Sequence, residues 1–310
     1  MSSPMKTLLL SLFTYLLSAP ILWASNTDTV QLHKHVLSLT TTNKARNHQN
    51  LQELNQAADY IKAEFTKLQG NVTEQVYKVN GTDYRNIILS SGPANAPLLV
   101  VGAHYDVCGN QPGADDNASG VAGLLEVARL LQNHTLPFRV DFVAYTLEEP
   151  PYFRTANMGS YVHAKSLAEQ KAQVLGMVSL EMIGYFKEEK GTQRYPIAPM
   201  KLVYGSRGNY IAVVQRFGNG KFGRSFLRGF NQAATLPVKS LKAPAAIPGV
   251  DFSDHLNYWY FGFSALMITD TSFYRNTNYH QPGDTIYTLD FARMARVVDG
   301  VYQTILSLRI

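Results

Sequence analysis

Four short runs rich in apolar residues divide the chain, and polar or turn-forming residues bound each of them. The runs cover residues 98–103, 140–145, 174–180 and 263–268. Nearly continuous apolar runs of this length are typical of strands that are buried on both faces of a sheet. Residues 72–79 and 84–89 alternate more loosely on either side of Asn80-Gly81, a dipeptide that favours a hairpin turn.

Segments with helical periodicity lie between and around these runs. Apolar residues recur every three or four positions over residues 51–68, 121–131, 161–167 and 291–308. Buried strands that alternate with helices predict an α/β fold, a three-layer sandwich in which helices flank a mixed, mostly parallel central sheet. Residues 237–250 contain three prolines and a glycine, and we expect them to form a long loop near the substrate face.

The first 24 residues have a different pattern from the rest of the chain. A short head that ends in Lys6 precedes an apolar run and small residues, as is typical of a secretory signal peptide. Ser18 and Pro20 interrupt the run, which weakens the alternative of a membrane anchor. We expect residues 1–24 to be a signal peptide, or alternatively an anchor, and residues 25–310 to form one domain that is periplasmic or secreted.

Composition narrows the function of the 310-residue chain. Its 28 Lys and Arg against 23 Asp and Glu give a net charge of +5, and no basic block suggests a nucleic-acid partner. Because Cys108 is the single cysteine, an internal disulfide and a zinc cage made of cysteines are both excluded. Nothing in the pattern indicates an oligomeric state.

Polar side chains of the metal-ligand type follow three of the predicted buried strands. They are His104, Asp106, Glu148, Glu149 and Glu181. Because ligands of open α/β sheets bind at the carboxyl ends of the strands, we expect these side chains to converge. Asp116 lies between the first of these strands and its helix, and His280 follows the last strand, so both can reach the same edge. Imidazole and carboxylate groups suit zinc, and a bridging carboxylate can hold two ions about 3.5–4 Å apart.

From about residue 84 to its end, the chain resembles the secreted co-catalytic zinc aminopeptidases, whose clan also includes glutamate carboxypeptidases and glutaminyl cyclases. Six segments in the family's order carry the resemblance: His104-Tyr-Asp106, Pro112-Gly-Ala-Asp-Asp-Asn-Ala-Ser-Gly120, Leu147-Glu-Glu149, Leu180-Glu-Met-Ile-Gly184, Asp251-Phe-Ser-Asp-His255 and Tyr279-His-Gln-Pro-Gly-Asp-Thr285. The resemblance implies a zinc exopeptidase-like fold and a substrate class of peptides with a free N-terminus.

The resemblance also assigns a role to each candidate residue. It makes Asp116 the ligand that bridges two zinc ions. His104 and Glu181 would complete one site, and Glu149 with His280 would complete the other.

Two further roles follow from the same motifs. Glu148 would be the general base that takes a proton from a metal-activated water, and Asp106 would orient His104 through its second ring nitrogen. Many relatives carry Asp at the position of Glu181, which keeps the same carboxylate. The resemblance also suggests a cis peptide bond between Asp116 and Asn117.

Three alternatives remain beside the aminopeptidase. Glutaminyl cyclases replace the first aspartate of the pair and carry an acidic residue at the position of Ser253, so Asp115 and Ser253 favour the peptidases. A carboxypeptidase of the same clan would need an arginine aimed at the substrate carboxylate. A non-catalytic binding domain would have lost ligands or the base, and this chain retains Glu148. Cys108 is interpreted as a bystander thiol, and residues 236–256 and 257–274 are expected to shape the side-chain pocket.

Overall fold

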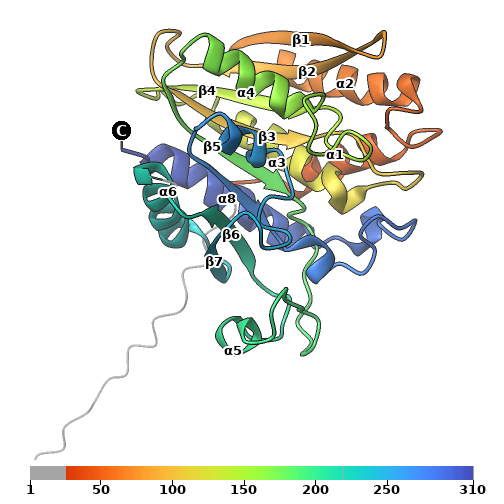
Figure 1. Ribbon diagram of the computed structural model, residues 1–310, viewed down its shortest axis with the longest axis vertical. Coiled ribbons are helices and arrows are strands. Elements are labelled where there is room, and N and C mark those ends of the chain that lie inside the picture. Colours follow the sequence, from red (N-terminus) through yellow and green to blue (C-terminus); the bar gives the residue numbers. More distant parts are fainter. Residues whose placement is uncertain (1–25, 219, 310) are drawn as a thin grey trace, which may run out of the picture.

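The computed structural model describes residues 26–218 and 220–309, so the predicted leader, residues 1–24, lies outside the described residues. Eight strands form one sheet in the order β1-β2-β4-β3-β5-β8-β6-β7 (Figure 1). The strands are β1 (Asn71–Val79), β2 (Thr82–Ser91), β3 (Leu98–His104), β4 (Arg139–Tyr145), β5 (Val174–Glu181), β6 (Ile211–Arg216), β7 (Val238–Ala243) and β8 (Ala265–Thr269).

The centre of the sheet is parallel and its edges bring in the antiparallel pairs. Strands β4, β3, β5 and β8 run parallel to their neighbours within this group. The β1–β2 hairpin joins β4 in antiparallel fashion, and the parallel pair β6–β7 joins β8 through an antiparallel β6. The predicted mixed, mostly parallel sheet is therefore confirmed.

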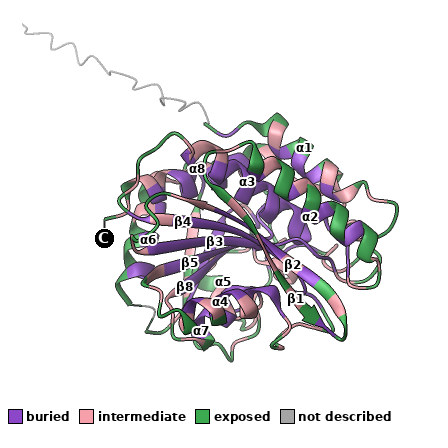
Figure 2. Cartoon of the chain, turned by 90° about the horizontal axis from the view of Figure 1, so that it is seen from above, coloured by how far each residue is buried: buried purple, intermediate pink, exposed green. Residues whose placement is uncertain are grey.

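Helices cover both faces of the sheet and give the expected three layers (Figure 2). Helices α1, α2, α3 and α8 lie on one face with the larger apolar cluster, and α4 and α7 lie on the other face with a smaller one. The helices are α1 (Thr29–Thr40), α2 (Leu51–Thr66), α3 (Gly120–Leu131), α4 (Gly159–Glu169), α5 (Met200–Tyr204), α6 (Gly220–Ala233), α7 (His255–Tyr260) and α8 (Phe291–Ser307). No helix within residues 26–218 and 220–309 is long and apolar enough to span a membrane.

The prediction of a long loop over residues 237–250 is wrong for the first half of that segment, because β7 occupies Val238–Ala243. This edge strand pairs with β6 alone and leaves lysines exposed or half-buried along its length, so it lacks the apolar run of a central strand. Helices α1 and α6 also went unpredicted. For α6 the helical periodicity is present in the sequence, since Phe222, Phe226 and Phe230 recur every fourth residue and are all buried.

Candidate metal centre

The carboxyl ends of neighbouring parallel strands bring the first candidate ligands together. His104 is the last residue of β3 and Glu181 is the last residue of β5, two strands that pair directly. Beyond the ends of β4 and β5 the chain turns sharply, with positive φ angles of 59° at Leu147 and 49° at Met182. Such conformations cost about 1–3 kcal/mol each and concentrate at functional sites. The turn at Leu147 leads directly into Glu148 and Glu149.

The five predicted ligands form two groups that share Asp116. In the first half-site, Nε2 of His104 lies 3.4 Å from Oδ1 of Asp116 and 3.3 Å from Oε2 of Glu181. In the second half-site, Nε2 of His280 lies 3.1 Å from Oδ2 of Asp116 and 3.2 Å from Oε2 of Glu149. Two ligands of one tetrahedral zinc ion, each about 2.0–2.1 Å from it, are about 3.3–3.4 Å apart. The distances from each histidine to its two carboxylates are therefore close to those between two ligands of one zinc ion.

Two donor atoms of the second half-site have no hydrogen-bond partner among the described residues, namely Oε1 of Glu149 and Nε2 of His280. Burial, together with the neighbouring Asp116 carboxylate, raises the pKa of Glu149 to about 8. Carboxylates at this depth require a compensating positive charge. The donor set and its unpaired atoms therefore fit divalent zinc ions.

Asp106 contacts both the first histidine and the acidic pair. Its Oδ1 lies 3.6 Å from Nδ1 of His104, which places it on the side of the second ring nitrogen. Its carboxylate also accepts the backbone N–H groups of Glu148 and Glu149, each at 3.1 Å. This second contact was not predicted, and it lets Asp106 fix the backbone of the proposed base and of a ligand at once.

Glu148 lies beside the ligands without joining either half-site. Its Oε2 is 3.9 Å from Nε2 of His104, and the residue is 7% exposed. Burial raises the pKa of this carboxyl well above its usual value, although the nearby His104 acts in the opposite direction. A buried carboxyl at the edge of the cluster, whose pKa depends on the neighbouring charges, is suited to exchange a proton with a nearby water.

Comparison with known proteins now places the chain in a family. The model for Peptidase family M28 matches residues 86–305. The chain belongs to this family. The resemblance inferred from the sequence and the peptidase class are thereby confirmed.

Individual relatives support the same placement of this M28 peptidase. The protein YfbL of Escherichia coli is 47% identical over 279 residues, which cover 87% of this chain and 85% of that protein. A probable leucine aminopeptidase of Arthroderma otae is 28% identical over 69% of this chain and 55% of its own length. Among solved structures, LapA aminopeptidase of Legionella pneumophila has a TM-score of 0.71 at 18% identity, covering 90% of this chain and 71% of that one. Glutaminyl cyclase of Porphyromonas gingivalis has a TM-score of 0.69 at 17% identity, covering 92% and 99%. At these identities the two structures support the fold alone.

The carboxylate of Asp284, to which the sequence analysis gave no role, binds the backbone of the loop that carries Asp116. Asp284 accepts the backbone N–H of Asp115 at 2.9 Å and that of Asp116 at 3.0 Å. Because Asp284 lies four residues after His280, it ties the loop of one ligand to the loop of another. The peptide bond between Asp116 and Asn117 is cis, as the resemblance suggests.

Arg46 is a second functional residue that the sequence did not reveal. It is 1% exposed and precedes the part of the chain that the family model matches. Its guanidinium donates to the carbonyl oxygens of Tyr105 at 2.8 Å, Leu39 at 3.1 Å and Gly113 at 2.6 Å, and also to that of Pro112. Burial lowers the pKa of Arg46 to about 10, so it remains charged at neutral pH near Asp116 and Asp284. All four contacts are to backbone, and no motif marks them.

A cavity lies next to the loop that carries His280. Apolar and aromatic side chains dominate its walls, among them Met267, Phe252, Phe273 and Tyr274. The ring of Phe273 lies 5.5 Å from that of Tyr279, which stacks on His280 at 3.8 Å. Segments 248–252 and 267–274 thus each contribute residues to the cavity, and both fall within the segments expected to shape a side-chain pocket.

Proposed function

We propose that this M28 peptidase is a zinc-dependent aminopeptidase that removes the N-terminal residue from peptides with a free α-amino group. One catalytic domain over residues 25–310 would hold two zinc ions. The observation that carries the proposal is the orientation of Asp116, whose two oxygens face two different histidines at 3.4 and 3.1 Å. This arrangement suits a carboxylate that bridges two ions.

In this proposal each residue has a defined task. His104, Asp116 and Glu181 hold one ion, and His280, Asp116 and Glu149 hold the other. Zinc, when bound, supplies Lewis-acid activation of water and of the scissile carbonyl group. Glu148 takes a proton from the attacking water and returns it to the leaving amine. The cavity lined by Phe252 and Met267 receives the side chain of the residue that is released.

The contacts of individual residues favour an aminopeptidase over its clan alternatives. In place of the acidic residue of the cyclases, Ser253 donates a hydrogen bond to Glu181 at 2.8 Å and so supports a ligand. Five arginines considered for a carboxypeptidase are otherwise engaged or exposed. Arg275 donates to Gln193, Arg154 pairs with Asp251 at 2.5 Å, Arg207 donates to the carbonyl oxygen of Glu188, and Arg224 and Arg228 lie exposed on α6.

We also propose that the protein is exported, to the periplasm or outside the cell, with residues 1–24 as the signal peptide. Amino-terminal sequencing of protein recovered from the cell envelope and the medium tests this. A mature chain that begins near residue 25 supports cleavage, and an intact Met1 in the membrane fraction supports an anchor instead.

The activity is tested with a panel of substrates that share one aminoacyl residue. The panel contains the residue with a free amino group, the same residue with a blocked amino group, an N-terminal glutaminyl peptide and a peptide with a free carboxyl end. Metal-free protein is assayed before and after addition of zinc. Zinc-dependent cleavage of the free-amino substrate alone supports the proposal. Cyclisation of the glutaminyl peptide, or release of the C-terminal residue, would replace it with one of the alternatives.

A further inference from the structure

One long segment of the chain contains basic residues and no acidic ones. Residues 190–250 include no Asp or Glu, and they hold ten of the 28 Lys and Arg residues. The remaining 18 basic residues are outnumbered by all 23 Asp and Glu, so the rest of the chain is net acidic. The segment does not read as a basic block, because at least two other residues separate each basic residue from the next.

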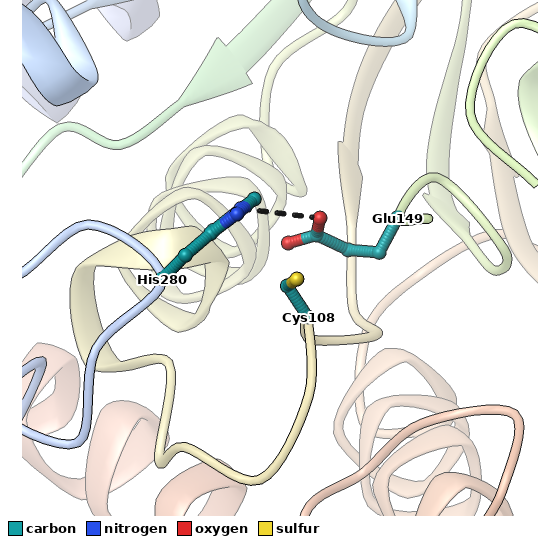
Figure 3. Close-up of side chains that lie close together, drawn as sticks. All are labelled: Cys108, Glu149 and His280. Atoms are coloured by element: carbon teal, nitrogen blue, oxygen red, sulfur yellow. Dashed lines mark ion pairs between the residues drawn. The ribbon is translucent and has the colours of Figure 1, made fainter. Parts of the chain in front are cut away.

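The fold collects this basic segment at one end of the sheet. The segment forms α5, β6, α6 and β7, and β6 and β7 are the last two strands in the sheet order (Figure 1). None of its ten basic side chains forms an ion pair with a described residue, whereas Arg85 and Arg129 elsewhere pair with carboxylates. Carboxylates gather instead at the metal centre, where Glu149 is directed to His280 with Cys108 beside them (Figure 3). The positive charge at this end of the sheet is therefore not neutralised by neighbouring side chains.

Helix α5 adds exposed apolar side chains to the charged end. Its Met200 and Tyr204 lie four residues apart, so they share one face of the helix, and both line the cavity described above. Tyr204 also donates a hydrogen bond to the carbonyl oxygen of Ser240 in β7 at 2.9 Å. Because this face holds α5 on the protein, Leu202 and Val203 turn outward, where they are 90% and 73% exposed.

The exposed apolar residues lie among basic ones on a projection of the chain. The two aliphatic residues of α5 directly follow Lys201, and Ile197, which is 53% exposed, precedes Lys201 by four residues. The backbones of Lys190 and Arg207 pair where the chain enters and leaves this projection (Figure 1). Residues 190–207, the α5 projection, therefore present aliphatic side chains with cations around them.

This combination fits a membrane surface better than another polyanion. Basic side chains are attracted to anionic headgroups, and apolar side chains of a surface helix enter the boundary between headgroups and acyl chains. Exposed apolar patches rimmed by polar residues mark such interaction sites. A nucleic acid or an acidic peptide would pair with the charges but would leave Leu202 and Val203 in water.

We propose that the α5 projection docks on a bilayer that contains anionic phospholipids. Leu202 and Val203 enter the headgroup region, and Lys201 contacts lipid phosphate groups. The basic side chains of α6 and β7 add longer-range attraction to the same surface. The proposal is independent of the proposed function, because docking requires neither a metal ion nor a peptide substrate.

Sedimentation of the full chain with lipid vesicles tests the contribution of charge. Vesicles of phosphatidylcholine with phosphatidylglycerol present an anionic surface, and phosphatidylcholine alone presents a neutral one. We expect binding to the anionic vesicles that weakens as salt is added. K190E/K201E should bind at least about 20-fold more weakly, because each basic side chain near such a surface contributes about fivefold in affinity. The matched control K44E/K171E, which changes two exposed lysines outside the basic segment, should stay within about twofold of the wild type.

The apolar contribution is tested with L202S/V203S. Burial of one such side chain favours binding by at least about tenfold, so we expect at least that loss of affinity for anionic vesicles. The matched control V30S/V76S replaces two exposed valines of α1 and β1 and should bind like the wild type. Hydrogen exchange of residues 194–204 should slow with anionic vesicles only. This readout is local, so it does not depend on how residues 1–24 behave.

Two sets of results would overturn the proposal. The first is equal binding to anionic and neutral vesicles without slower exchange in residues 194–204. The second is weaker binding of K190E/K201E together with unchanged binding of L202S/V203S, because charge alone would then account for the attraction. Tighter binding to a DNA duplex than to vesicles in that second case would make the surface a nucleic-acid site. Neither set bears on zinc-dependent cleavage, which is assayed separately.

Discussion

The two half-sites differ in how the fold holds them. In the first, His104 and Glu181 end two paired strands, and their side chains are 1% and 6% exposed. In the second, His280 comes from a loop and its side chain is 24% exposed. The sheet itself fixes the first pair, whereas the loop of His280 is tied through Asp284 to the loop of the shared Asp116. Similar chemistry is therefore supported by regular structure on one side and by loop contacts on the other.

The bridge offers the largest expected effect, because both half-sites share Asp116. D116N should lose both ions. We expect turnover to fall by more than the roughly 10²–10⁴-fold that loss of a general base causes, because the metals are lost as well. Zinc per chain and initial rates on an aminoacyl substrate measure it.

D115N is the matched control for this variant. Asp115 is buried beside Asp116, but its oxygens accept hydrogen bonds from the backbone N–H of Gly184 at 3.0 Å and from the side chain of Asn276 at 2.8 Å. D115N should keep both ions. If D116N retained two zinc ions at wild-type affinity, Asp116 would not be the bridge.

Adjacent Glu148 and Glu149 should separate the base from a ligand. E148Q keeps shape but removes the proton acceptor, so we expect about 10²–10⁴-fold slower turnover at unchanged zinc content. E149Q should instead weaken binding of the ion in the second half-site, because a neutral amide is a poor substitute for an anionic ligand. Zinc loss in E148Q with zinc retained in E149Q would reverse the two roles.

The order of metal release should distinguish the two half-sites directly. Under a limiting chelator we expect the wild type to release zinc in two phases, with the more exposed His280 ion leaving first. H280A should lack the fast phase, and H104A should lack the slow one. Each variant should weaken one ion by more than the roughly 10- to 100-fold that follows loss of a supporting contact. Release in a single phase, unchanged in both variants, would contradict the asymmetry.

The same contrast explains what the sequence could predict. His104, Glu149 and Glu181 follow apolar runs, and the convergence of parallel strand ends brings such residues together whatever the loops do. His280 could be placed only loosely, in a loop after the last predicted strand, and its role as a ligand came from the resemblance, because a loop has no periodicity that reveals where it returns. Neither the strand pattern nor the resemblance could identify Arg46, because it donates hydrogen bonds to backbone carbonyl groups, which every sequence contains. Likewise, β7 was missed because an edge strand need not be apolar.

A smaller effect is expected for the contact that holds the loop of Asp116. In D284N one acceptor oxygen becomes an amide that faces a backbone N–H, so we expect zinc affinity to fall by about 10- to 100-fold. Competition with a fluorescent chelator measures it. The matched control is D290N, whose side chain accepts the backbone N–H of Arg293 at the start of α8. D290N should lower stability slightly without changing zinc affinity, and an equal loss of affinity in both variants would show that the effect is not local.

The smallest effect on activity is expected for a substitution of His163. Such a variant can distinguish inactivation by acid unfolding from inactivation by release of metal in acid. Nδ1 of His163 lies 2.6 Å from the hydroxyl of Tyr258, and burial lowers the pKa of His163 to about 3. The unfolded chain takes up this proton near pH 6.5 and the folded chain does not. The stability that depends on neutral His163 is therefore complete above pH 6.5 and is lost as the pH falls toward 3.

H163Q should remove this part of the acid sensitivity. Between pH 6.5 and pH 5 the wild type should lose about 2 kcal/mol of unfolding free energy more than H163Q, since one pKa unit corresponds to about 1.4 kcal/mol. Urea unfolding of the metal-free proteins measures the difference, because the carboxylates and histidines of both half-sites titrate alike in the two chains and cancel. Parallel losses in the two proteins would mean that His163 is protonated in the folded state, and acid inactivation would then have to be traced to the half-sites themselves.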